Sequence, residues 1–227
     1  MKNSVIVLIA FLAVFLDCTA QKTEFTLDYT ASYLLPKSQD TVKISIGNAG
    51  EYLYTDSRAI TKNLESSYSK FVGDNPDGEF KMKLLVNMDN LDMLLHANMG
   101  RHTIAGNVNL SSFMKNRASD GEAHFMKSQE TDEQVEVMGK KYSLVGLFPD
   151  NEPDDVLYVA FDDRYDMDYN TYFKKIFSTI IGQQFELDIP KGIVVYAKDK
   201  NGEELLRLIH IEKERQTGKI DLSLIIE

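Results

Sequence analysis

Four histidines are the side chains in this sequence best suited to hold a transition metal. They are scattered along the chain, at His96, His102, His124 and His210. His96 and His102 could approach each other across a hairpin and share an ion. A zinc site needs three or four ligands, and the sequence places no third ligand near this pair. We therefore expect strand or surface histidines and no metal site.

Oxygen ligands near residue 170 have the spacing that opens a calcium loop. Asp166, Asp168 and Asn170 alternate as the first three ligands of an EF-hand do. Such a loop then needs glycine at its sixth place and glutamate at its twelfth, where this chain has Thr171 and Phe177. Capping of a helix N-terminus explains the spacing better, and an adventitious calcium site is the alternative.

Patterns that support catalysis are missing from the sequence. Asp162 and Asp163 are adjacent, so on a strand they would point to opposite faces and could not share one glycoside substrate. There is no Gly-x-Ser-x-Gly elbow, Walker loop, dinucleotide-binding glycine motif or His-Glu-x-x-His motif. We therefore predict no catalytic residues and no cofactor, and an enzyme ranks behind the two non-enzymatic hypotheses given below.

The N-terminal segment has the pattern of a signal peptide. Lys2 supplies a positive charge, and residues 5–16 form an unbroken apolar run. The small residues Cys18 and Ala20 then stand at positions −3 and −1 of a cleavage site. We predict cleavage between Ala20 and Gln21, which would deliver the chain to the periplasm or the extracellular space.

Two alternatives for the N-terminus stay open. The apolar run could be an uncleaved membrane anchor, although it is shorter than the ~20 residues that a spanning helix needs. Cys18 could instead carry a lipid, as in bacterial lipoproteins. Such sites want a small residue where this chain has Asp17, and leucine where it has Phe15. We therefore expect a cleaved signal rather than lipid anchoring.

Composition limits the architecture and the partners. Removal of residues 1–20 from the 227-residue chain leaves 21–227, a length that suits a single domain. The one cysteine lies in the signal segment, so the core must hold this domain together without disulfides. A formal net charge of −10 argues against nucleic acid and against docking on anionic lipid. No later segment is long and apolar enough to span a membrane, and the oligomeric state is left open.

Alternation of apolar and polar residues predicts about ten strands. Turn residues at 47–50 and Asn201-Gly202 predict hairpins, and Thr217-Gly218 predicts a further turn. Residues 115–133 are polar and are predicted to be a long loop, whereas 203–211 is apolar on both faces and should be a central strand. The predicted strands and hairpins lie at 24–29, 41–55, 80–86, 91–95, 102–104, 135–144, 156–161, 192–198, 203–211 and 219–226.

Two segments have the apolar spacing of helices. One begins near Ser57 and ends at Gly73, and the other covers 167–181. The second has an aromatic and isoleucine face opposite Lys174 and Lys175. That face must lie against apolar side chains, most simply on the concave side of the sheet. The predicted fold class is α+β: a large curled antiparallel sheet, a half-barrel of about ten strands, closed by one or two helices.

Apolar side chains of the sheet and the second helix could line a cavity for an apolar ligand. Methionine suits such a cavity because its side chain is adaptable. A filled core is the competing explanation, and cores explain most apolar stripes. The candidate ligand-binding residues are Met82, Leu84, Met93, Tyr169, Phe173, Ile176, Phe177 and Ile180.

The order of these elements resembles the LolA-like and LolB-like lipoprotein-localisation fold, and more closely the exported domains of Gram-negative bacteria in that superfamily. The resemblance covers most of 21–227. It is carried by the strands 80–86 and 91–95, by the strand, glycine and tyrosine pattern of 135–142, and by 156–161 followed by the aromatic helix and the terminal strands.

The resemblance implies a periplasmic or surface binding module with an apolar cavity, with lipid or a lipoprotein as partner and no catalysis. The family's functional residues have no counterpart here that can be aligned. Those domains often carry a cysteine shortly after the glycine that corresponds to Gly139, and this chain has none there. Lipocalins are a rival barrel, but their Gly-x-Trp signature requires a tryptophan that the sequence lacks.

We therefore expect a non-enzymatic exported binding protein with an apolar cavity, for lipid or a lipidated partner. The alternative is a structural or protein-interaction domain of the cell envelope, with a filled core and no ligand.

Overall fold

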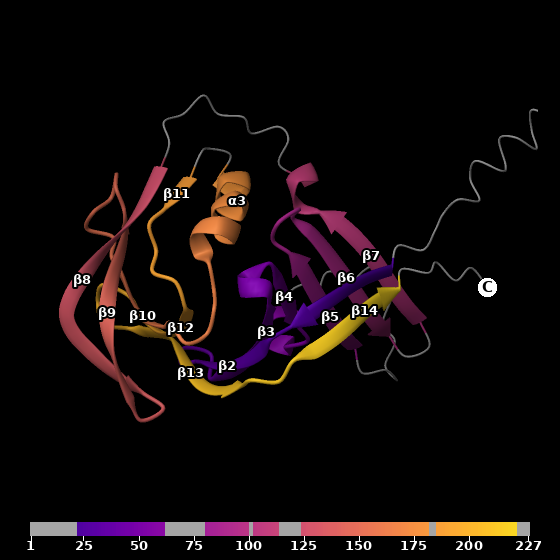
Figure 1. Ribbon diagram of the computed structural model, residues 1–227, viewed down its shortest axis with the longest axis horizontal. Helices are drawn as coiled ribbons and strands as arrows, with labels where there is room; N and C mark the ends of the chain where they lie inside the picture. The colour runs from indigo at the N-terminus through magenta and orange to yellow at the C-terminus, as the bar shows by residue number, and fades with distance from the viewer. Residues whose placement is uncertain (1–21, 62–79, 100–101, 114–123, 182–184, 222–227) are drawn as a thin grey trace, which may run out of the picture.

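The computed structural model describes residues 22–61, 80–99, 102–113, 124–181 and 185–221 (Figure 1). The predicted signal peptide lies outside these ranges, as does most of the helix expected after Ser57, of which residues 58–61 are described and helical. Residues 115–123 of the predicted loop and the end of the last predicted strand also lie outside them.

The described chain is mostly β-structure. The strands are accompanied by helix α3 (Tyr169–Ile181), by the helical residues 58–61, and by two short 3-10 helices, η1 (Asn48–Gly50) and η2 (Leu110–Phe113). The strands are β1 (Lys22–Leu27), β2 (Tyr29–Leu35), β3 (Asp40–Gly47), β4 (Tyr52–Thr55), β5 (Phe80–Asn87), β6 (Asp92–Met99), β7 (His102–Asn109), β8 (His124–Val137), β9 (Lys140–Pro149), β10 (Leu157–Asp162), β11 (Phe185–Leu187), β12 (Ile193–Lys198), β13 (Glu204–Glu212) and β14 (Gln216–Asp221).

Twelve strands form one sheet, in the order β11-β8-β9-β10-β12-β13-β2-β3-β4-β5-β6-β7. The large and mainly antiparallel sheet is thus confirmed, with β13 in the interior as predicted. The predicted half-barrel of about ten antiparallel strands is wrong in two respects. The sheet is open, with β11 and β7 at opposite edges, and β11 pairs with β8 in parallel. Since β11 follows α3 instead of a tight hairpin turn, nothing forces it to run antiparallel.

The predicted strand 24–29 breaks at Asp28. Its backbone N–H donates to the carbonyl of Ile46 at 2.7 Å, and its carboxylate accepts the N–H of Asn48 at 2.8 Å. Beyond this break β2 enters the middle of the sheet, whereas β1 leaves it and pairs with β14. The alternation of Phe25, Leu27 and Tyr29 runs unbroken across Asp28, so the pattern gives no sign that the two strands bury their side chains in different cores.

The antiparallel pair of β1 and β14, here called the ribbon, crosses one face of the large sheet over β3 and β4 (Figure 1). Phe25 and Leu27 are buried there against Leu85 of β5 and Leu94 of β6. The contact is close, because a Cβ atom on Gly47 would lie 1.9 Å from the carbonyl oxygen of Thr26. Gly47 is therefore the point at which the ribbon rests on the sheet.

The ribbon also corrects the prediction for the C-terminal strands. Thr217 and Gly218 do not form a turn but lie within β14, where Gly218 is paired with Phe25. A Cβ atom on Gly218 would lie 2.2 Å from the Phe25 ring. The glycine that resembles a turn signal in the sequence therefore leaves room for an aromatic ring on the neighbouring strand.

Helix α3 packs on the opposite face of the sheet from the ribbon. Met167, Tyr169 and Phe173 join the core that Tyr29 and Ile46 form in β2 and β3. The register places these β2 and β3 residues on the face opposite Leu85 and Leu94. The described residues contain no helix with the length and apolar character needed to cross a membrane.

The N-terminus of α3 is fixed by polar contacts. The carboxylate of Asp168 accepts the N–H of Thr171 at 3.0 Å and lies 2.7 Å from Lys191, which confirms the predicted capping role. The side chain of Asn170 bonds both backbone groups of Ile189, at 2.9 and 3.1 Å. These contacts join the helix to the segment that leads into β12.

The long hairpin of β8 and β9 corrects the predicted loop. Residues 124–133 are strand, although they are polar, because β8 is exposed along most of its length. The predicted glycine break is confirmed, with positive φ at Met138 and Gly139. The far end of the hairpin approaches β12 and β13, where Arg207 donates to the carbonyl of Glu136 at 3.1 Å.

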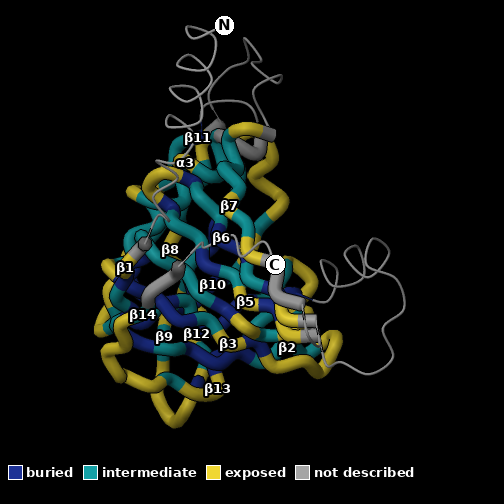
Figure 2. The backbone as a smooth tube through the Cα atoms, turned by 90° about the vertical axis from the view of Figure 1, so that its right-hand side faces the viewer, coloured by how far each residue is buried: buried dark blue, intermediate teal, exposed yellow. Residues whose placement is uncertain are grey.

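Buried residues gather along the middle of the sheet, through β3, β10 and β12, while the turns are exposed (Figure 2). Because the ribbon and α3 take opposite faces of the central strands, those strands are buried from both sides. The face under the ribbon is covered by β1 and β14, which are the first and the last strand of the described chain.

We predict that Gly47→Ala destabilises the protein by about 1–3 kcal/mol, because the added methyl group collides with backbone that cannot rotate away. The control is Gly106→Ala in β7, where a Cβ atom would meet nothing within 4 Å. It should change stability by less than about 1 kcal/mol. Urea unfolding measures both, and equal losses would show that the ribbon does not rest on Gly47.

We also predict that Phe173→Ala lowers the free energy of unfolding by about 3 kcal/mol, through loss of buried aromatic surface. Lys174→Ala on the same helix removes only a half-exposed ion pair with Glu186. That change should cost no more than about 1 kcal/mol. A urea melt in which the lysine variant is the weaker of the two would mean that α3 packs by its other face.

Candidate functional site

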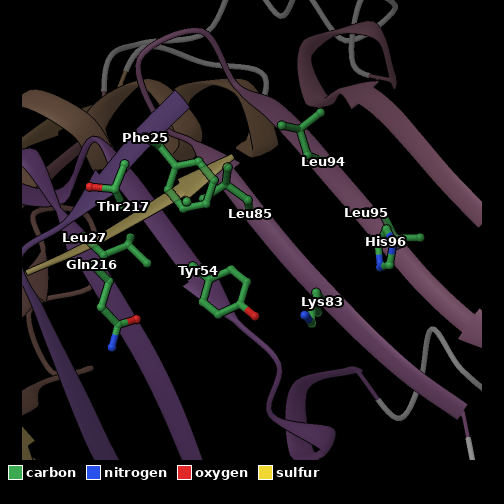
Figure 3. Close-up of a pocket in the computed structure, with 11 residues that line it drawn as sticks. Phe25, Leu27, Tyr54, Lys83, Leu85, Leu94, Leu95, His96, Gln216 and Thr217 are labelled. Atoms are coloured by element: carbon green, nitrogen blue, oxygen red, sulfur yellow. The ribbon is translucent and has the colours of Figure 1, made fainter. Parts of the chain in front are cut away.

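A cavity of about 380 Å³ lies between the ribbon and the face of β4, β5 and β6 that the ribbon covers (Figure 3). Ribbon and sheet each contribute part of its wall, so it exists only because β1 leaves the sheet at Asp28. Its lining residues are Phe25, Leu27, Tyr54, Lys83, Leu85, Leu94, Leu95, His96, Gln216, Thr217 and Gly218.

One part of this cavity, here called the ribbon cavity, is apolar. Leu85 and Leu94 are paired across β5 and β6 and form its floor. Phe25 and Leu27 of the ribbon pack against the same two leucines, and the Phe25 ring stacks on Tyr52 with 6.2 Å between ring centroids. These aliphatic and aromatic side chains make the site suitable for a hydrocarbon group.

The other part of the ribbon cavity carries polar side chains. Lys83 and His96 are paired across β5 and β6, next to the leucine pair and on the same face. The Nδ1 atom of His96 is buried and has no hydrogen-bond partner among the described residues. Burial, and secondly the Asp56 carboxylate, raises the pKa of Tyr54, so its hydroxyl stays protonated and able to donate.

A second hollow lies where β8 and β11 run parallel at the sheet edge. Its wall combines the exposed ring of Phe125 with Lys127, Glu186 and Asp188, so charges of both signs line it. A third lies beside the ribbon, around Asp28 and Arg215. The ribbon cavity combines an apolar floor with His96, whose buried Nδ1 atom has no partner among the described residues. The other two hollows lack this combination, so the ribbon cavity is the better candidate.

The sequence-predicted cavity residues lie elsewhere. Met82 is 2% exposed and packs with Leu95 and Ala97, and the register places Leu84 and Met93 on the same face as Met82, away from the ribbon. None of the predicted residues whose side chains are described lines any of the three hollows.

The predicted residues on α3 come together as a row of rings. Tyr169 and Phe173 have their centroids 5.3 Å apart, and Phe173 and Phe177 6.5 Å apart. The row continues to Phe161 of β10 and Phe185 of β11. Ile176 is half-buried on the same helix, and the side chain of Ile180 lies outside the described part.

Sequence reasoning missed the ribbon cavity because it assigned only one face of β5 to the interior, whereas both faces are buried. Alternation put Met82 and Leu84 inside and left the face with Lys83 to solvent. The available signal was Leu85, since a leucine that shares a face with lysines indicates a second buried surface. The roof of the cavity had no local signal, because residues of β1 and β14 meet from opposite ends of the chain.

Asp162 and Asp163, the two carboxylates considered for catalysis, differ in burial and in their contacts. Asp162 is 3% exposed, accepts the Tyr142 hydroxyl at 2.9 Å and the Nε of Arg164 at 2.7 Å, whereas Asp163 is exposed. The hydrogen bond from Arg164 is the main cause that holds the pKa of Asp162 below its usual range. The hydrogen bond from Tyr142 acts in the same direction, and burial opposes both. Asp162 is therefore an ionised anchor at the end of β10.

The two histidines considered as a metal-binding pair are not brought together. His96 is paired with Ala105 and His102 with Met99, so the two lie at different levels of the β6 and β7 hairpin. Among the residues that the structure describes, no three histidine, cysteine, aspartate or glutamate side chains are grouped as metal ligands would be.

Because the folded pKa of Asp162 is lowered, its contribution to stability is present above the ordinary carboxyl value of about 4. That contribution is lost as the pH falls through the lower folded pKa. We predict that Asp162→Asn costs about 1–3 kcal/mol at pH 7 and flattens the loss of stability at acid pH. Asp163→Asn is the matched control and should behave like wild type. Urea unfolding between pH 7 and pH 3 tests this, and an unaltered acid slope would contradict it.

Comparison with known proteins adds no assignment to this geometry. No family model, no curated protein and no solved structure matches the chain. The resemblance to the lipoprotein-localisation fold accordingly stays a prediction.

Proposed function

We propose that this protein is a non-enzymatic, exported binding protein that takes an apolar chain, from a lipid or a lipidated partner, into the ribbon cavity. The observation that carries the proposal is the buried apolar floor of Leu85 and Leu94 under the Phe25 and Leu27 roof. A volume of about 380 Å³ falls within the range of small-molecule sites. Export rests on the N-terminal signal pattern.

The expected affinity follows from the hydrophobic effect. Each methylene group that leaves water contributes about 0.8 kcal/mol, so ten would offer ~8 kcal/mol before ordering costs. Such a sum corresponds to a dissociation constant in the micromolar range at best. Because the floor and most of the roof are already buried and packed, little further ordering of the protein is required.

A protein-interaction domain is the second candidate. Leu205 and Ile209 of β13 are 38% and 42% exposed. Strand β13 already has β12 and β2 as its neighbours in the sheet, so a further strand cannot pair with it and cover these side chains. An apolar surface of that kind suits a protein partner. It predicts a protein that co-purifies with the chain and no saturable uptake of lipid.

Two adjacent residues of β6 distinguish the two faces of the sheet. We predict that wild-type protein takes up a fluorescent long-chain fatty acid saturably and that Leu94→Trp, which fills the ribbon cavity, weakens uptake at least about tenfold. Met93→Trp is the matched control, since its side chain points to the α3 face. Thermal melts verify that both variants stay folded.

Fluorescence titration gives three distinguishable results. Loss of uptake in the Leu94 variant alone supports the ribbon cavity. Loss in the Met93 variant alone would move the ligand to the α3 face, where the sequence first suggested it. Wild-type protein without saturable uptake would overturn the binding function and favour the interaction domain.

A further inference from the structure

The ribbon cavity joins an apolar floor directly to a cation. The Leu85 and Leu94 pair and the Lys83 and His96 pair are two residues apart along β5 and β6, on one face. Two strand residues span about 7 Å, so the polar pair lies one headgroup away from the floor. A ligand that fills both parts must carry a polar group at the end of its hydrocarbon chain.

We infer, on the basis of the proposed function, that the ligand is a long-chain monocarboxylic acid whose carboxylate is held by Lys83 and His96. Figure 3 shows these two side chains on neighbouring strands, with the Tyr54 hydroxyl directed toward Lys83. An ammonium group, an imidazole and a phenol can all donate hydrogen bonds. A carboxylate only accepts them and has two oxygen atoms for several donors.

The charge of the lining supports an anionic headgroup. The eleven lining residues include one lysine and no aspartate or glutamate, in a chain that has 35 acidic and 25 basic residues. Asp56 lies outside the lining and acts on the Tyr54 hydroxyl. A positive site within an acidic protein is an exception to the overall charge, and it would repel an ammonium headgroup.

Within the described part of the chain, the Lys83 ammonium and the Nδ1 atom of His96 each lack a partner. Lys83 forms no ion pair with a carboxylate of the described residues, whereas Lys174, Lys191 and Lys198 each form one. Buried polar atoms without a hydrogen bond are rare in folded proteins, and His96 Nδ1 is such an atom. A ligand oxygen within the cavity would supply a partner for the Lys83 ammonium, and the His96 imidazole lines the same cavity beside it.

One positive charge also limits the headgroup. A phosphate monoester carries up to two negative charges and is usually held by several cationic or backbone donors. The ribbon cavity has one lysine and a histidine, which matches a single carboxylate better. A phosphorylated amphiphile is therefore an outcome that the experiment must be able to detect.

The test uses full-length protein and three probes with the same chain: dodecanoate, dodecanol and dodecyl phosphate. Each displaces a fluorescent fatty acid in a competition titration. We expect dodecanoate to compete at least about tenfold better than dodecanol, as a charged hydrogen bond would give. Lys83→Met, which retains an apolar stem, should remove this preference and leave dodecanol unchanged.

Lys81→Met is the matched control, because Lys81 shares the strand and face of Lys83 but does not line the cavity. It should keep the full preference, and His96→Leu should lose part of it. Equal binding of dodecanoate and dodecanol, or a preference that survives Lys83→Met, would overturn the carboxylate assignment alone. Tighter binding of dodecyl phosphate would overturn it too. Failure of every probe to bind would instead overturn the proposed function.

Discussion

The rest of the structure depends on the contact between the backbone of β1 and the surface of β3 at Gly47. Any side chain at this position would meet the carbonyl of Thr26, so the ribbon could not lie against the sheet. With glycine there, Asp28 can bond Ile46 and turn the chain out of the sheet. Phe25 and Leu27 then bury their side chains on Leu85 and Leu94, and the space left beside them is the ribbon cavity.

Burial on both faces explains why a twelve-stranded open sheet can be stable. Helix α3 covers β2 and β3 from one side, and the ribbon covers β4 to β6 from the other. At the opposite end, the β8 and β9 hairpin bends toward β12 and β13, where Lys198 pairs with Glu133 at 2.6 Å. Each part of the sheet thus has a different cover, which requires apolar residues on both faces of several strands.

Sequence patterns predicted the parts of this fold that are encoded locally. The hairpin at 41–55, the strands after Phe80 and helix α3 follow from period and turn residues within a few positions. The break at Asp28, the ribbon and the parallel β11 could not be predicted in this way, since their causes are contacts between distant segments. The site was missed for a related reason: alternation assigns one buried face to a strand, and β5 has two.

The ribbon and the floor of the cavity differ in how firmly they are held. The floor strands β5 and β6 are hydrogen-bonded on both sides within the large sheet, whereas β1 and β14 pair only with each other in the sheet topology. Local opening costs least where few hydrogen bonds and buried contacts must be broken. The polar pair therefore lies on the more firmly held element. In the proposed binding function it would fix the headgroup position, and the ribbon would adjust to chains of different length. An apolar ligand that displaced the ribbon would replace the contacts that Phe25 and Leu27 lose. In the proposed function, the contact that closes the cavity would therefore also set the free energy of admitting a chain.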